Sequence, residues 1–110
     1  MPESKMNEVA EQLLSQSKEH KVSWEEISRR GAYRVHFPDI ALTITRVNTY
    51  LEEVSGMRLE LMSDAGSVID SLETKPEDSM HSILSQIFDL AQQEIRDSGI
   101  DKALGYLKRS

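Results

Sequence analysis

The three histidines are the side chains best suited to acid–base or metal chemistry, and their spacing predicts neither. His20, His36 and His81 are far apart in the chain, and no second histidine shares a clear helix face with any of them. Asp78 precedes His81 by three residues, but such a pair is more typical of a solvated helix start. The chain has no cysteine, which excludes disulfides, thiolate metal sites and cysteine nucleophiles. We therefore predict no metal site and no cofactor.

The sequence also lacks phosphate-binding and nucleophile motifs. Its five glycines are isolated, so there is no glycine-rich phosphate loop. No serine lies in an elbow with glycine on both sides. Carboxylates that are neighbours in sequence, such as Glu25 and Glu26, point apart on a helix and indicate solvated charge. We predict a non-catalytic protein with no small-molecule ligand.

The basic residues between positions 18 and 46 depart from the acidic background of the chain. This segment holds six Lys and Arg against four Asp and Glu, a balance of +2 in a chain whose net charge is −6. The excess would suit an acidic partner, a nucleic acid or a second copy, and it would equally suit the solvated face of a strand and a helix. The candidate contact residues are Arg29, Arg30, Arg34 and Arg46.

The segment MRLELMSDAGSVIDSLE, residues 57–73, predicts a β-hairpin around which the fold is organised. Its first half alternates apolar and charged residues, the period of two that buries one face of a strand. Gly66 supplies the positive φ that a three-residue turn with a bulge requires. We expect the two strands at about 57–63 and 67–73.

Two helices are predicted before the sheet. Apolar residues at helical spacing over residues 4–20 indicate an amphipathic helix, which either faces the core or forms a dimer seam. Ser23 and Glu26 have the spacing of a capping box, and Gly31 is suited to the left-handed position that ends a helix. Residues 23–30 are therefore predicted as a short second helix.

Residues 40–55 fit two structures, and the choice between them decides the architecture. The alternating β-branched residues favour a strand to about Arg46, followed by irregular or helical turns. The apolar spacing also fits a single helix over 43–55. With that helix, the order of elements is that of a winged-helix DNA-binding domain whose wing is the 57–73 hairpin. We prefer the strand because of the density of Ile and Thr at alternating positions.

The last third of the chain predicts one long helix and one short helix. A second capping box at 74–77 marks the start, and apolar residues from Met80 to Ile95 form a wide buried face. Gly99 is suited to the left-handed position of a Schellman turn that ends this helix. Asp101 would then cap the last short helix.

These segments together predict an α+β fold in a single domain, residues 1–110. A four-stranded antiparallel β-meander packs against an N-terminal helix and a long C-terminal helix, with strands at about 32–37, 40–46, 57–63 and 67–73. The start of the chain has no apolar run typical of a signal peptide, and no stretch is apolar and long enough for a membrane span. We expect a cytoplasmic protein.

The expected function is that of a small protein–protein interaction module, accessory or regulatory, that associates with itself as a homodimer. The chain has more amphipathic helix than one small sheet face needs, and its two ends differ in charge. The alternative is a winged-helix DNA-binding regulator. The net charge of −6 weighs against nucleic acid as the main partner, and no membrane partner is expected.

Overall fold

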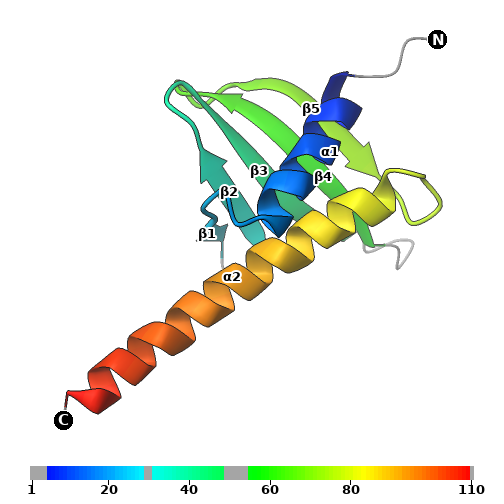
Figure 1. The fold of residues 1–110 in the computed structure, drawn as a ribbon. Coiled ribbons are helices and arrows are strands. Elements are labelled where there is room, and N and C mark those ends of the chain that lie inside the picture. Colours follow the sequence, from blue (N-terminus) through cyan, green and yellow to red (C-terminus); the bar gives the residue numbers. More distant parts are fainter. Residues whose placement is uncertain (1–4, 29–30, 49–54, 110) are drawn as a thin grey trace.

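The residues that the structure describes, 5–28, 31–48 and 55–109 of this computed structural model, form two helices and five strands (Figure 1). In chain order the elements are α1 (Lys5–Lys18), β1 (Glu25–Ser28), β2 (Ala32–His36), β3 (Ile40–Asn48), β4 (Ser55–Ser63), β5 (Val68–Thr74) and α2 (His81–Lys108). The strands form one sheet in the order of the chain, each antiparallel to the next. The predicted α+β class with an antiparallel sheet is confirmed, with five strands in place of four.

The additional strand, β1, lies where the capping box predicts a short helix. β1 pairs with β2, so the prediction of a helix over 23–30 is wrong for the described part of that segment. An eight-residue helix forms few hydrogen bonds for the cost of ordering its first turn, whereas the edge of β2 offers backbone partners at once. Gly31 does take the predicted left-handed conformation, with a φ of 87°, but it precedes β2 and does not end a helix.

Strands β2 to β5 lie where the alternation of apolar residues predicts them. Ile44 of β3 is opposite both Tyr33 of β2 and Leu59 of β4, and all three side chains are buried. Residues 43–48 are extended, so the helical interpretation of that stretch is wrong, and the winged-helix order of elements that requires it is not found there. Residues 49–54, which hold the rest of that predicted helix and the alternative turns, lie outside the described residues.

The hairpin of β4 and β5 has the predicted turn. Gly66 has a φ of 89°, and its N–H donates to the carbonyl oxygen of Ser63 at 3.0 Å. The N–H of Ser63 donates to the carbonyl oxygen of Ser67 at 2.8 Å, which closes the three-residue loop. A separate irregularity lies further along the hairpin, where the pairing shifts by one residue between Leu61 and Met62. The prediction of this hairpin is confirmed.

Both helices lie on one face of the sheet, and the core lies between them and the strands (Figure 1). α1 buries the apolar residues that its spacing predicts to face the core, and α2 does so only along its first half. The helical residues of the core are Met6, Ala10, Leu13, Leu84, Ile87, Phe88 and Ala91.

α2 differs from the prediction at both ends. Thr74 belongs to β5 and its hydroxyl contacts His81 Nδ1 at 3.1 Å, so the predicted cap at 74–77 is wrong and the helix begins at His81. Asp78 lies before the helix, where its carboxylate accepts a hydrogen bond from the N–H of Lys75 at 2.8 Å. The helix then continues through Gly99 without a break, because one interior glycine costs only about 1 kcal/mol. Within the described residues, no helix has the length and hydropathy that a membrane crossing requires.

Gly31 and Gly66 provide a matched test of how closely α2 presses on the sheet. Both have positive φ, but a Cβ added to Gly31 would lie 3.0 Å from Cζ of Phe88, whereas nothing lies within 4 Å of one added to Gly66. We expect Gly31→Ala to lower the free energy of unfolding by about 2–3 kcal/mol and Gly66→Ala by about 1 kcal/mol. Urea denaturation of both variants measures the difference. Equal losses would mean that Phe88 does not constrain Gly31.

Candidate functional site

The basic residues that the sequence suggests as a contact surface do not form one. Arg34 lies on the face of the sheet away from the helices, opposite Thr43. Arg46 shares the helix-facing side of β3 with Ile44, and its guanidinium lies 4.7 Å from the centroid of the Phe88 ring. Arg29 and Arg30 lie outside the described residues. Strand alternation therefore separates Arg34 from Arg46.

Arg34 belongs instead to a small ion-pair network at the edge of the sheet. Its Nε donates to Glu25 Oε1 at 2.8 Å, and Nε2 of His36 lies 2.7 Å from the same oxygen. The hydrogen bond from Arg34 lowers the pKa of Glu25 below its ordinary value of 4.5. The charged groups of Glu25, Arg34 and His36 are therefore paired with one another, and this network is not a candidate site.

The candidate site lies on the second half of α2, which leaves the body of the protein. Ile95 is the last residue of α2 that packs against the core, and every residue from 96 to 109 is exposed. We call residues 96–109 the tail. At 1.5 Å per residue it is about 20 Å long, and Figure 1 shows it projecting away from the sheet and α1.

The tail carries an apolar stripe that faces away from the direction of the core. The tail stripe consists of apolar residues spaced at i, i+3, i+4 and i+7, the pattern of a helix face that is buried. Ile100 is 50% exposed and Leu104 is 45% exposed. At 100° per residue, the centre of the stripe lies about 150° around the helix from the face that buries Leu84 and Phe88. Its members are Ile100, Ala103, Leu104 and Leu107.

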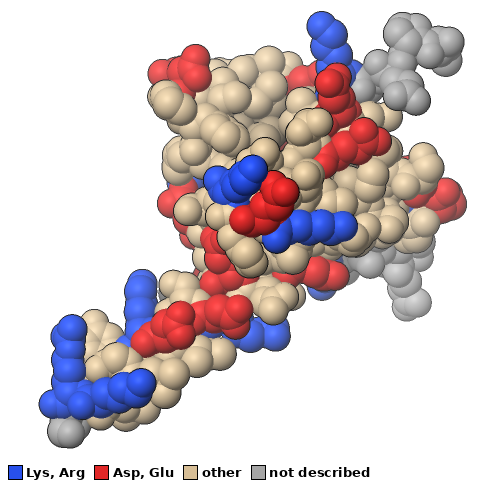
Figure 2. Space-filling view, in the orientation of Figure 1, with Lys and Arg blue, Asp and Glu red and all other residues tan. Residues whose placement is uncertain are grey.

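Charge changes sign along α2 (Figure 2). Acidic residues lie where the tail leaves the body, and from Lys102 to Arg109 the chain has three basic residues and no acidic one. Within the described part of the chain, Asp97, Asp101 and Lys108 form no ion pair. These side chains are therefore available to a partner that covers the tail stripe.

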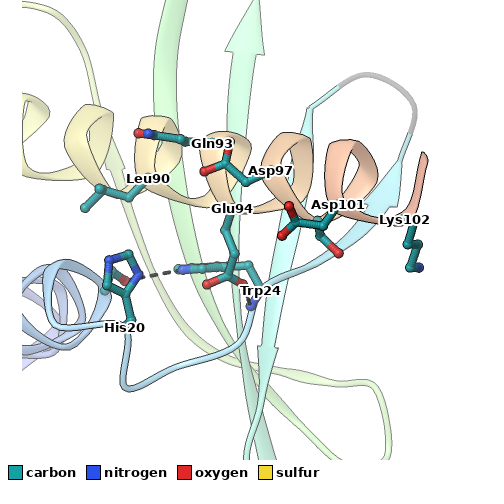
Figure 3. Close-up of a pocket in the computed structure, with 10 residues that line it drawn as sticks. His20, Trp24, Leu90, Gln93, Glu94, Asp97, Asp101 and Lys102 are labelled. Atoms are coloured by element: carbon teal, nitrogen blue, oxygen red, sulfur yellow. Dashed lines mark hydrogen bonds between the residues drawn. The ribbon is translucent and has the colours of Figure 1, made fainter. Parts of the chain in front are cut away.

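A groove of about 670 Å³ lies at the base of the tail, between α2 and the end of α1 (Figure 3). α1 ends in a Schellman turn in which His20 has a φ of 57° and the N–H of Lys21 donates to the carbonyl oxygen of Gln16 at 2.9 Å. This turn directs the chain under α2 to Trp24, which is buried. The groove is lined by Ser17, His20, Trp24, Leu90, Gln93, Glu94, Asp97, Ser98, Asp101 and Lys102.

Trp24 fixes the floor of this groove. Its indole Nε1 donates to Ser17 Oγ at 3.3 Å, and its backbone N–H donates to Glu94 Oε2 at 2.5 Å. Figure 3 shows the Glu94 side chain reaching from α2 toward Trp24, with Asp97 and Asp101 further along the same helix. The carboxylate of Glu94 therefore has a structural partner, and those of Asp97 and Asp101 define the open acidic rim.

Two other hollows are less suited to a partner. The sheet face opposite the helices forms a shallow groove of about 450 Å³, in which Arg34 and His36 are already paired with Glu25. A second hollow of about 490 Å³ beside α1 is lined by apolar residues such as Val9 and Phe37. Neither hollow shows charge that distinguishes one kind of occupant.

Among the residues described, no group of three or more His, Cys, Asp and Glu is placed to hold a metal ion. No protein-family model, curated protein or solved structure matches the chain.

The network around Glu25 makes a small contribution to stability that depends on pH. Because the pKa of Glu25 is lowered in the folded state, its contribution is present above the ordinary value of 4.5 and is lost as pH falls through the lowered pKa. We expect Glu25→Gln to lower the melting temperature slightly at pH 7, and we expect this difference to shrink as the pH falls from 4.5 through the lowered pKa of Glu25. Glu26→Gln is the control, since Glu26 forms no ion pair with a described residue. A difference in melting temperature that does not shrink as the solution is made acidic would contradict this account.

Proposed function

We propose that this protein is a non-catalytic protein–protein interaction module that associates with itself through the tail of α2. The observation that supports this proposal is the tail stripe, which lies on a part of α2 where every residue is exposed. Single exposed apolar residues are common on protein surfaces and need no explanation. A run of them on one helical face is different, because this pattern is typical of a surface that a partner covers.

The energetics of the tail favour the same conclusion. Isolated helices of about this length are marginal in water, since most helix stability in proteins comes from packing of an apolar face. Gly99 and Gly105 lower the intrinsic stability of the tail further. A partner that packs on the tail stripe would supply the contacts that the body of the protein does not.

The body serves in this proposal as a rigid mount for the tail. Leu84, Ile87 and Ala91 are fully buried against the sheet and α1, which fixes the direction of α2. The tail then presents its stripe at a distance from the body, as in recognition modes in which an amphipathic helix packs on an apolar partner surface. The body and the tail can therefore be tested separately by substitution.

Leu104→Glu tests the proposal. We expect the wild-type chain to increase in mean mass from 12.5 kDa toward twice that value as its concentration rises through the micromolar range, because the stripe is buried in the pair. The variant should remain at the monomer mass, and its melting temperature at low concentration should be unchanged, because Leu104 lies outside the core. Light scattering coupled to size exclusion measures the mass.

Ile69→Glu is the matched control for that experiment. Ile69 is 56% exposed, but it lies on β5, away from the tail. This variant should associate as the wild type does. A wild-type chain that stays monomeric at all of these concentrations, or a control variant that loses association equally, would contradict the role of the tail.

A further inference from the structure

We infer that two copies of the chain pair their tails as antiparallel helices, about a two-fold axis that passes between residues 103 and 104 of each copy. This inference rests on the proposed function, since it requires that the partner of the tail stripe be a second copy. It adds the relative direction of the two helices and the residues that lie opposite each other, and it names the charged residues that favour this arrangement.

The spacing of the tail stripe is symmetric about its own midpoint. Ile100 and Leu107 are equally far from the point between Ala103 and Leu104, so an antiparallel pair centred there places Ile100 beside Leu107 of the partner subunit. The same operation places Ala103 beside Leu104 of the partner subunit. A small residue thus faces a large one on both sides of the axis, which allows close packing of the two helices.

The charges on the flank of the stripe favour the antiparallel direction. At 100° per residue, Asp97, Asp101 and Lys108 lie within about 40° of one another, on the same side of the stripe. A two-fold axis perpendicular to the helices keeps this flank on the same side of the pair in both copies. Lys108 of the partner subunit then comes level with Gly99, between Asp97 and Asp101.

A parallel pair would lose these contacts. It would bring each residue level with its own copy and would place the two charged flanks on opposite sides of the pair, so that Lys108 would face neither Asp97 nor Asp101 of the partner subunit. The two helix dipoles would also point in the same direction, which is less favourable than an opposed arrangement. The distribution of charge therefore discriminates between the two directions where the apolar stripe alone does not.

The groove at the base of the tail extends the interface. In the antiparallel register, residue 109 of one tail is level with Ser98 of the other, and Ser98 lines the groove together with Asp97 and Asp101. The basic tip of one copy thus reaches the acidic rim of the other. Two tails of about 20 Å bury less surface than a standard stable interface. The dimer should accordingly dissociate on dilution.

Disulfide trapping tests the direction of the pair, and the absence of cysteine from the chain makes single cysteines unambiguous. Ile100→Cys and Leu107→Cys should each cross-link poorly alone, because in the antiparallel pair identical positions are about 10 Å apart along the axis. A mixture of the two variants should cross-link readily. Labelling one variant with nitrogen-15 allows mass spectrometry to identify the mixed dimer, since the two chains otherwise have equal mass.

Charge exchange tests the register. Lys108→Glu should weaken dimerisation by about fivefold in sedimentation equilibrium, because it places a third negative charge beside two others. Adding Asp97→Lys and Asp101→Lys to that variant should restore the wild-type dissociation constant. Lys75→Glu is the control: it makes the same change of charge at an exposed position in the segment before α2, away from the tail and the groove, and it should have little effect.

The possible failures of these experiments are distinguishable. Efficient cross-linking of each single-cysteine variant with itself, or no response to Lys108→Glu, would overturn the antiparallel pairing and leave self-association in place. A wild-type chain that remains monomeric would overturn both proposals. A monomeric chain that cosediments with vesicles of anionic phospholipid would also overturn both proposals, because the tail stripe would then bind a membrane surface.

Discussion

The contact of Phe88 with the sheet is the interaction on which the rest of the structure depends. Its ring meets the ring of Tyr33 edge to face, with centroids 5.3 Å apart and an interplanar angle of 66°, and its face carries the guanidinium of Arg46. Because Gly31 has no side chain, the edge of the Phe88 ring can lie against its backbone. One side chain of α2 thus fixes the start of β2, the end of β3 and the direction of the helix.

This contact also explains why the two halves of α2 have different surfaces. The first half packs on the buried residues Tyr33, Ile44 and Leu59, which lie side by side on three strands, so its apolar residues lie on one face of the helix. Beyond Ile95 there is no sheet to match, and the apolar residues move to nearly the opposite face. In our proposal, this change of face along a continuous helix corresponds to two separate packing partners, one within the chain and one outside it.

Several elements could be predicted from the sequence because their signals are local and agree with their packing. In the 57–73 hairpin, the alternation, the turn residue and the flanking strands all specify the same structure. β1 could not be predicted in this way. Its capping-box residues are a local helix signal, and the competing partner is the edge of β2, which a local pattern does not reveal. The end predicted at Gly99 failed for a related reason, because a glycine permits a helix stop without enforcing one.

The candidate site shows the same limit in its clearest form. The four arginines appear as a cluster because they are near in sequence, yet strand alternation places Arg34 and Arg46 on opposite sides of one sheet. The tail stripe has the reverse property. Its spacing is visible in the sequence, but it forms one face only if the helix continues past Gly99, and it is exposed only because the core ends at Ile95. An exposed apolar face of this kind therefore requires two conditions. The apolar residues must have helical spacing, which the sequence shows. The rest of the chain must also leave that face uncovered, which only the three-dimensional structure shows.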